Sequence, residues 1–414
     1  MMKKKTAKLL SAALAGCMLL TGSVTVMAEE KPTVTLMLEL SSFPPLVKAV
    51  EMAREKFPEY NIVSKEWSID GVKRAIKTTQ AAGGEESIDI AFFSSTGIMG
   101  FAETGLLNDL TPYLEEDAQW KDSFIESTLN ACSVDGKIYG VPWQAAYPVL
   151  LANKDIFDEV GIEIKDDWTY DELTEVCAEL QEHGYFGLGV SAGNDAWLIR
   201  QSYLNSFESE DDLDAFNNGQ ISIMDERVKE AFERVKALYD NNYCYPGEGA
   251  LALTQDELLV GFSNSKIAMI AATNGAVTAS IEQSGLTNCQ VVNFPSISNI
   301  STANLLGAPD VYFVPSNAKN MDATMDVLKY LTSTEVLTAM ADTGCVVPLK
   351  EVNTVNPLYP ELSKDMGRLH SHDIANLSDE MGDYISVTAV TNYCYGGESA
   401  LEELEQMRLN AIGE

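Results

Sequence analysis

Alternating strand-like and helix-like segments between residues 33 and 93 restrict the fold more than any other feature of the sequence. Thr33–Leu38 is rich in β-forming residues, whereas residues 46–57 carry apolar side chains at helical spacing. Asn61–Trp67 predicts a second strand, residues 72–79 a second helix, and Ile88–Phe93 a compact apolar strand of the kind buried in parallel sheets. The order β-α-β-α-β predicts an α/β protein whose parallel strands are joined by right-handed crossovers.

The loops that follow these strands are where we expect a ligand site, because ligands of such sheets bind beyond the carboxyl ends of the strands. Glu39–Pro45 follows the first strand, and Ser94–Gly97 follows the strand that ends at Phe93. Both loops are rich in hydroxyl groups and poor in cations. Helix capping is a competing explanation for the serines of the second loop.

A second α/β region follows the first. Its expected elements are strands near residues 149–152, 187–190 and 267–272, and helices near 170–183, 197–207 and 227–239. A Ser/Asn-rich linker at 296–304 precedes a strand at 310–315 and a helix at 321–331, and the chain ends in helices, the last near 399–412. With 414 residues the chain is too long for one ordinary core, so we expect two domains.

The first 28 residues have the parts of a secretory signal. Four lysines precede an apolar run from Leu9 to Met27, and Ala28 ends a cleavage site of small and β-branched residues. An alternative cleavage site before Cys17 also stays open, because Leu14–Cys17 matches a lipobox. In that case Cys17 is acylated and becomes the N-terminus. Cleavage after Ala28 predicts a secreted protein, and acylation of Cys17 predicts one anchored at the cell surface. No later segment has the apolar length of a membrane span.

Charge and cysteine content exclude several classes of function. The chain carries 28 basic and 62 acidic residues, a net charge of −34 that repels phosphate backbones, so nucleic acid is not an expected partner. None of the cysteines beyond the signal has C-x-x-C spacing, which argues against a metal knuckle or a redox motif. They could form disulfides, Cys244–Cys394 being one hypothesis, or be buried small apolar residues.

Several segments together resemble the extracellular solute-binding proteins of ATP-driven (ABC) importers, the group that includes maltose-binding protein. They are the signal and, in the order that the family uses, IDIAFFSSTGIMGFAETGLLNDLTPYL, DGKIYGVPW followed by VLLANKDIFDEVGI, TYDELTEVCAEL, FSNSKIAMIAATNG and YFVPSNAKNMDATMDVLKYLTS. Each string is weakly specific, but their joint order covers nearly the whole chain beyond the signal.

The resemblance implies a two-lobed type II periplasmic-binding-protein fold of the α/β class, with a ligand cleft between the lobes. It places the signal peptide at 1–28, lobe one at 31–145 plus 300–340, and lobe two at 150–295 plus 345–414. The chain would cross between the lobes near Val141–Leu151, Asn293–Leu306 and Cys345–Pro348. Hinge closure of such lobes around a ligand is a known repertoire.

The function that the resemblance implies is capture of a sugar or oligosaccharide and its delivery to a membrane permease. We expect a monomer that is not an enzyme and needs no cofactor or metal. A polyamine or amino-sugar binding protein of the same fold stays open, because three acids lie near the expected cleft. A secreted glycan-acting hydrolase is the alternative of a different class, since it needs only two carboxylates.

A sugar-binding cleft needs aromatic rings for the C–H face of the sugar and carboxylate or amide groups for its hydroxyl edges. Mapping by position in the matching strings gives candidates of these kinds in lobe one, at the crossing and in lobe two. They are Glu39, Ser42, Phe43, Ser95 and Thr96; Trp143, Gln144 and Tyr147; and Asn194, Asp195, Trp197, Asn274, Pro309, Asp310 and Tyr384. Arg200 is the nearest cation, and this scarcity of cations disfavours phosphate or sulfate as ligand.

One departure from the family and two enzyme-like motifs qualify this prediction. Maltose-type members place an aromatic residue just after the glycine that corresponds to Gly275, whereas this chain has Ala276-Val277, which weakens a claim for maltodextrin. Asp342-Thr343-Gly344 matches the aspartic-protease triplet, but that chemistry needs a second copy. His370 and His372 could help to bind a metal on a strand, but an exposed polar stretch is the favoured explanation.

Overall fold

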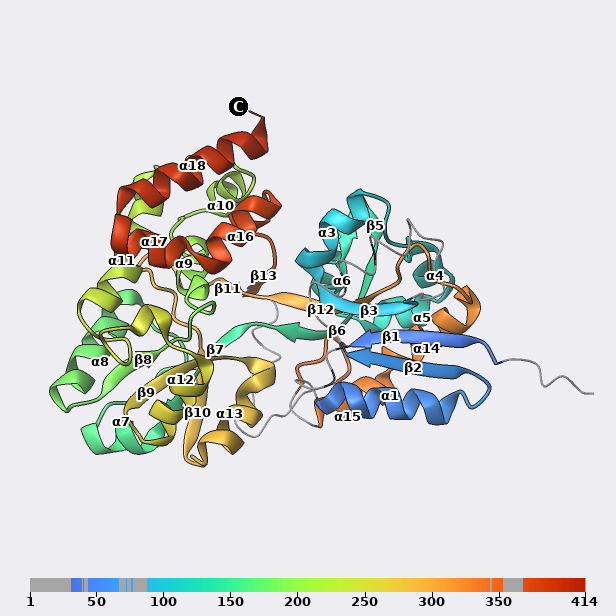
Figure 1. Cartoon of the computed structure of the whole chain (residues 1–414), viewed down its shortest axis with the longest axis horizontal. Coiled ribbons are helices and arrows are strands. Elements are labelled where there is room, and N and C mark those ends of the chain that lie inside the picture. The colour runs from blue at the N-terminus through green and yellow to red at the C-terminus, as the bar shows by residue number, and fades with distance from the viewer. Residues whose placement is uncertain are drawn as a thin grey trace, which may run out of the picture. The chain divides into compact units, whose positions relative to one another are not determined.

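The computed structural model describes residues 31–38, 40, 44–66, 72, 76, 88–342, 345–352 and 368–413. The expected signal peptide, Cys17, and the candidates Glu39, Ser42 and Phe43 lie outside the described residues, as does most of the helix expected at 72–79. Two mixed sheets, each with its own helices, confirm the prediction of a two-lobed α/β architecture (Figure 1).

The first sheet has five strands in the order β2-β1-β3-β12-β6. Its bounds are β1 (Thr33–Leu38), β2 (Asn61–Glu66), β3 (Ile90–Ser94), β12 (Ala308–Phe313) and β6 (Gly140–Ala146). β1 runs parallel to β2 and β3, as the β-α-β order predicts, whereas β12 runs antiparallel to both of its neighbours, β3 and β6. A strand from late in the sequence therefore occupies an interior position of the first sheet.

The first lobe is the set of elements packed around this sheet. Its remaining elements are α1 (Pro44–Lys56), α3 (Ser95–Glu103), α4 (Thr111–Glu116), α5 (Ala118–Ser123), α6 (Glu126–Asn130), β4 (Ser133–Val134), β5 (Lys137–Ile138), α14 (Met321–Leu331) and α15 (Thr334–Ala341). One apolar core holds them together, and it also includes Cys345, Val347 and Leu349. The segment that follows α15 therefore remains part of the first-lobe core as far as Leu349.

The second sheet has four strands in the order β10-β7-β9-β8, with bounds β7 (Pro148–Asn153), β8 (Phe186–Gly189), β9 (Ile267–Thr273) and β10 (Cys289–Asn293). Successive side chains of a strand point to opposite faces. On β7, Leu150 and Ala152 join one apolar cluster while Val149 and Leu151 join another. This strand is buried on both faces, which explains why its sequence is continuously apolar.

The second lobe is the set of elements packed around this four-stranded sheet. Its helices are α7 (Lys154–Val160), α8 (Tyr170–Glu182), α9 (Ala196–Leu204), α10 (Glu210–Asn217), α11 (Glu226–Asp240), α12 (Gln255–Ser263), α13 (Val277–Ser284), α16 (Asp379–Val387), α17 (Ala389–Gly396) and α18 (Glu398–Ile412). The short strands β11 (Leu305–Leu306) and β13 (Leu369–His370) pair with each other in parallel. The acidic run after Phe207 forms α10, because Ser209 caps its first turn and negative charge there is favourable.

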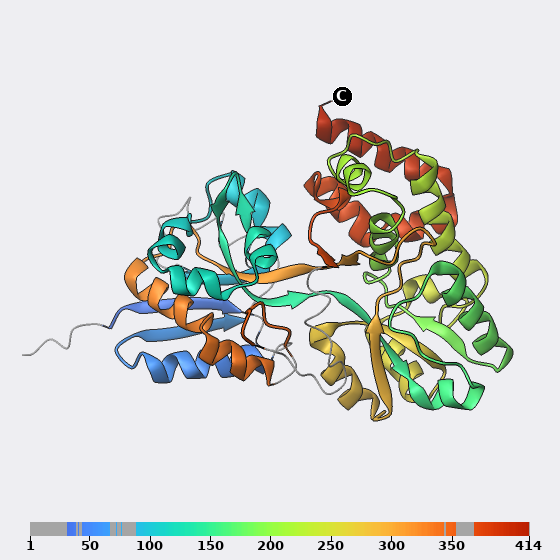
Figure 2. The ribbon, with the colours of Figure 1, turned by 180° about the vertical axis from the view of Figure 1, so that it is seen from behind.

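The two sheets are linked by chain segments that run from one to the other, as the views from both sides show (Figure 2). β6 continues into β7 with only Tyr147 between them, and β11 leads into β12 through Gly307. A third segment lies alongside, since Ala145 N–H donates to the Val346 carbonyl at 2.8 Å. The edge of the first sheet therefore meets the second lobe where β6, β12 and the 345–349 segment converge.

Two further sequence expectations can be compared with the described residues. No helix among them combines the length and the apolar character that a bilayer crossing needs. The six cysteines of the described part, Cys132, Cys177, Cys244, Cys289, Cys345 and Cys394, are free thiols. The hypothesis of a Cys244–Cys394 disulfide is therefore not met in this structure, and burial raises the pKa of both thiols.

Candidate functional site

A pocket of about 200 Å³ lies where the segments linking the two sheets converge. It receives residues from the first sheet, from the linking segments and from the second lobe. The lining residues are Ser94, Ala146, Tyr147, Pro148, Trp197, Arg200, Thr273, Leu306, Gly307, Ala308, Asp310 and Ser371. They combine an apolar floor with four hydroxyl groups, one carboxylate and one guanidinium, a mixture suited to a polar organic ligand.

The carboxylate of this pocket belongs to Asp310 on β12. The strand register places Asp310 opposite Ser94 of β3 on one side and opposite Gln144 of β6 on the other. Gln144 Nε2 donates to Asp310 Oδ2 at 2.7 Å, and Asp310 keeps 8% of its surface exposed. This hydrogen bond restricts the rotation of the carboxylate, so that Asp310 is held as a hydrogen-bond acceptor at the pocket wall.

The second lobe contributes the first turns of α9. Asp195 caps this helix, and its Oδ1 accepts from the backbone N–H groups of Gly193 and Ala196 at 3.2 and 3.0 Å. Burial raises the pKa of Asp195, and these backbone donors oppose the shift. Trp197 and Arg200 are three residues apart on one face of α9, and both line the pocket.

Trp197 is half-buried and is supported from behind. Its ring meets Phe294 edge-on, with centroids 6.2 Å apart and planes at 89°. This contact fixes the tilt of the indole while one part of it stays at the pocket, as a platform for an apolar face of a ligand requires.

Asn274 fastens the linking segment beside the pocket. Its Oδ1 accepts from Tyr147 N–H at 3.1 Å, its Nδ2 donates to the Ala145 carbonyl at 2.7 Å, and its own N–H donates to the Tyr147 carbonyl. With 4% exposure, the amide is used on the backbone and does not line the pocket. Asn274 thereby positions Tyr147, which does line it.

Close backbone approach also shapes the pocket at Gly307. A Cβ atom on this glycine would lie 2.9 Å from Tyr147 Cβ and 3.1 Å from the Ala146 carbonyl oxygen. Only a residue without a side chain lets β11 and β12 pass this close to the β6–β7 segment.

The sequence-predicted candidates separate into three groups. Tyr147, Trp197 and Asp310 line the pocket. Gln144, Asn274 and Asp195 lie behind the pocket and hold its elements in position. Asn194 Nδ2 donates to Ser191 Oγ beside the cap of α9. Pro309 is buried on β12, opposite Ala145 of β6. Trp143, Ser95 and Tyr384 are buried elsewhere, and Thr96 is placed only as a residue of α3.

Packing explains the burial of Trp143 and Tyr384 but not that of the Ser95 hydroxyl. Trp143 is fully buried in the first core, stacked on Tyr312 with centroids 5.8 Å apart. Tyr384 packs in the second core, and its hydroxyl donates to the Ala400 carbonyl at 3.3 Å. Ser95 Oγ is fully buried and has no hydrogen-bond partner among the described residues.

Sequence reasoning placed Ser94 in a loop expected to hold the site without naming it as a contact, and it named Arg200 only as the nearest cation. The lining residues that it missed are Ala146, Pro148, Thr273, Leu306, Gly307, Ala308 and Ser371. Ser94 does cap α3, since its side chain accepts from Gly97 N–H at 3.1 Å. Thr273 was within reach of sequence reasoning, because it ends the strand that precedes the candidate Asn274. Ser371 carries no local signal, because it reaches the pocket through the pairing of β13 with β11.

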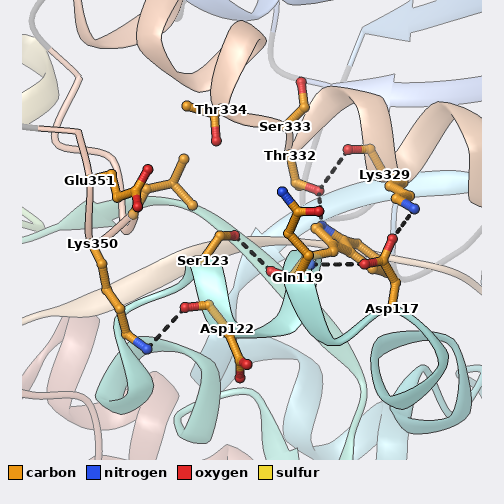
Figure 3. A pocket seen from close by; sticks show the side chains of 12 residues that line it. Asp117, Gln119, Asp122, Ser123, Lys329, Thr332, Ser333, Thr334, Lys350 and Glu351 are labelled. Carbon is orange, nitrogen blue, oxygen red and sulfur yellow. Dashed lines mark hydrogen bonds and ion pairs between the residues drawn. The ribbon is translucent and has the colours of Figure 1, made fainter.

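A larger pocket of about 500 Å³ lies within the first lobe, at α5 and the junction of α14 with α15 (Figure 3). Several of its polar groups already bond to neighbouring groups. Lys329 pairs with Asp117, Trp120 Nε1 donates to Thr332 Oγ1 at 3.0 Å, and Lys350 Nζ donates to the Asp122 carbonyl at 3.0 Å. This pocket is lined by elements of the first lobe, whereas the pocket at the linking segments receives residues from both lobes, so the latter is the better candidate for a two-lobed protein. Among the described residues, no three His, Cys, Asp or Glu side chains are grouped so that they could hold a metal ion.

Two α/β lobes joined by several linking segments, with a polar pocket where they meet, define the class of two-lobed binding proteins. The sequence matches the family profile described as "Bacterial extracellular solute-binding protein" over residues 49–365. The chain belongs to this family, whose members are binding proteins rather than enzymes, and the resemblance noted from the sequence is confirmed.

Individual relatives agree with this assignment. A binding protein of Brucella abortus is 23% identical over 256 residues, 61% of this chain, and the match spans only 60% of that protein. The maltooligosaccharide ABC transporter solute-binding lipoprotein of Streptococcus pneumoniae is 24% identical over 319 residues, 71% of this chain and 69% of the relative. The solved structure of a chitin oligosaccharide binding protein is 21% identical, covers 92% of this chain and 99% of its own, and superposes with a TM-score of 0.76, which shows a shared fold.

Proposed function

We propose that the protein captures a sugar or oligosaccharide between its two lobes and delivers it to the permease of an ABC importer. The observation that carries this proposal is the composition of the pocket at the linking segments: the fixed carboxylate of Asp310, the indole of Trp197, and hydroxyl groups from both lobes. An aromatic ring covers the C–H face of a sugar, and a carboxylate accepts from its hydroxyl groups. Membership of the family and the names of the relatives support the same ligand class.

Lobe movement is the second part of the proposal. We place lobe one at residues 31–145 plus 300–340 and lobe two at 150–295 plus 345–414, as the resemblance implies, except that the 345–349 segment is assigned to lobe one. Cys345, Val347 and Leu349 pack in the core of that lobe. Closure of the lobes over the ligand then creates the surface that the permease recognises.

The protein is proposed to release its ligand unchanged. A glycosidase needs two carboxylates flanking the bond that is cleaved. Asp310 is the only carboxylate among the described residues that line the pocket. Binding without turnover is therefore the activity that this site supports.

The protein is further proposed to act outside the cytoplasm as a monomer. The family is extracellular and the pneumococcal relative is a lipoprotein, which support a chain that acts outside the cytoplasm. Removal of residues 1–28 would release it, and acylation of Cys17 would anchor it; mass spectrometry of the mature N-terminus distinguishes the two. No cofactor is required by the proposed activity.

We expect at least one neutral saccharide to raise the melting temperature of the protein, because a ligand that binds only the folded state stabilises it. A thermal-shift screen of mono- and oligosaccharides, with spermidine and glucosamine included, would identify it. Calorimetry followed by chromatography of the recovered ligand would then test for turnover. Absence of any response across the panel would contradict sugar binding, and hydrolysis would favour an enzyme.

Replacement of Trp197 by alanine should weaken binding of that saccharide about 3- to 10-fold, because an aromatic contact contributes about 0.5–1.5 kcal/mol. Tyr395→Ala is a matched control, since Tyr395 is an aromatic residue of the same lobe, is 80% exposed, and does not line the pocket. Calorimetric titration measures both variants. Equal affinities for Trp197→Ala and the wild type would remove the indole from the site.

A further inference from the structure

Arg200 lines the pocket, and one nitrogen of its guanidinium already donates a hydrogen bond to a neighbouring carboxylate. Its side chain is 20% exposed, and Nε donates to Asp373 Oδ2 at 2.7 Å. Nη1 and Nη2 have no hydrogen-bond acceptor among the described residues. Because the five N–H donors of arginine form a rigid planar fork, fixing Nε also fixes the direction of the terminal nitrogens.

Asp373 is itself held in place. Its carboxylate is 1% exposed, its Oδ1 accepts from Ala375 N–H at 3.0 Å, and its own N–H donates to Asn376 Oδ1 at 3.0 Å. Both carboxylate oxygens thus have partners, one on the backbone of the short helix that follows and one on Arg200. A carboxylate buried in this way requires a paired cation, and Arg200 supplies it.

The charges around the pocket decide which ligands fit. The positive charge of Arg200 is paired with the negative charge of Asp373, and Asp310 contributes a carboxylate to the pocket wall. A ligand carboxylate could accept from Arg200 but would be repelled by Asp310. An ammonium group would satisfy Asp310, but it carries no acceptor for the N–H groups of Arg200. A hydroxyl group both donates and accepts, so neighbouring hydroxyls satisfy Asp310 and Arg200 at once.

We propose that Arg200 is a specificity-determining residue whose terminal nitrogens donate to hydroxyl oxygens of the bound sugar, and that Asp373 is a positioning residue that directs Arg200 and cancels its charge. The site then accepts neutral saccharides and discriminates against uronates. This inference rests on the proposed function, which it deepens by naming the ligand class and the residues that select it.

The test uses the wild-type protein, Arg200→Lys and Asp373→Asn. The neutral probes are galactose, maltotriose, raffinose, arabinotriose and chitotriose. The charged probe is the uronate counterpart of the neutral sugar that binds most tightly, in which one hydroxymethyl group is oxidised to a carboxylate. Arg227→Lys is the matched control, because Arg227 forms an ion pair with Asp225 in the same lobe away from the pocket. Circular dichroism and melting curves without ligand establish that each variant is folded at the temperature of titration.

Arg200→Lys keeps the positive charge beside Asp373 but replaces the planar guanidinium, with its two terminal nitrogens, by a single ammonium group. The affinity for the neutral sugar should therefore fall about tenfold or more. Asp373→Asn removes one negative charge behind Arg200, so the ratio of uronate affinity to neutral-sugar affinity should rise by at least about tenfold. A merely structural role for the pair would weaken both ligands alike and leave that ratio unchanged.

The outcomes separate the two proposals. If the wild type binds none of the saccharides, the proposed function fails. If the wild type binds a neutral sugar and Arg200→Lys binds it equally well, or Asp373→Asn keeps the wild-type ratio, the proposed function stands and the role of Arg200 and Asp373 is overturned. Weakening in Arg227→Lys equal to that in Arg200→Lys would likewise overturn it.

Discussion

Replacement of Trp143 by alanine is expected to lower the free energy of unfolding of the first lobe by about 3–5 kcal/mol. Trp143 is fully buried on β6, stacks on Tyr312 at a centroid distance of 5.8 Å, and meets Phe92 edge-on at 5.7 Å. Truncation would remove the ring from the contact between β3, β6 and β12 and leave a cavity that the surrounding strands cannot fully close. Urea unfolding monitored by circular dichroism measures the loss.

Trp197→Ala is the natural control for this experiment, because the two tryptophans differ in burial and in what they contact. We expect Trp197→Ala to change the unfolding transition far less than Trp143→Ala does, since Trp197 is only half-buried. Its effect should instead be on ligand affinity. Equal unfolding midpoints for Trp143→Ala and the wild type would contradict the packing described here.

Removal of the Asp310 carboxylate, in Asp310→Ala, should weaken saccharide binding about 10- to 150-fold. A hydrogen bond to a charged group contributes about 1.5–3 kcal/mol, and Asp310 is the carboxylate that Gln144 holds at the pocket wall. Asp310→Asn should fall between the wild type and Asp310→Ala, because an amide oxygen still accepts but carries no charge. Isothermal titration with the saccharide found in the screen measures the series.

Asp117→Ala controls for the loss of an acidic side chain in the first lobe. Asp117 lines the larger pocket of Figure 3 and caps α5, so its removal should cost about 1 kcal/mol of stability without changing ligand affinity. The opposite pattern, in which Asp117→Ala abolishes binding and Asp310→Ala does not, would move the site to the pocket within the first lobe.

The strands were predictable because their pattern is local. Thr33–Leu38 was expected as a strand and is one, and the apolar run before Ser94 forms β3 within two residues of its expected start. The expected helix at 170–183 forms α8, since Thr169 and Glu172 make a reciprocal capping box. Each of these elements depends on residues that are neighbours in the sequence.

The site was only partly predictable because its geometry depends on distant residues. Trp143 and Trp197 were equal candidates for aromatic contact with a ligand, yet Tyr312 and Phe92 bury the first, and no pattern near Trp143 reveals them. Asn274 was expected to contact a ligand, but its amide is used on Ala145 and Tyr147. Asp310 could be named from its position in the family-like strings, and the antiparallel register places it opposite Ser94, at the carboxyl end of β3.

The interior position of β12 has a consequence for how the chain is made. Both neighbours of β12 in the sheet, β3 and β6, leave the ribosome long before Ala308–Phe313 does. The first lobe therefore cannot complete its hydrogen-bonded ladder while the chain is still short, and its closure requires contacts of high sequence separation, which form slowly. A polypeptide that stays incompletely folded during synthesis is suited to passage across a membrane before it reaches its native state.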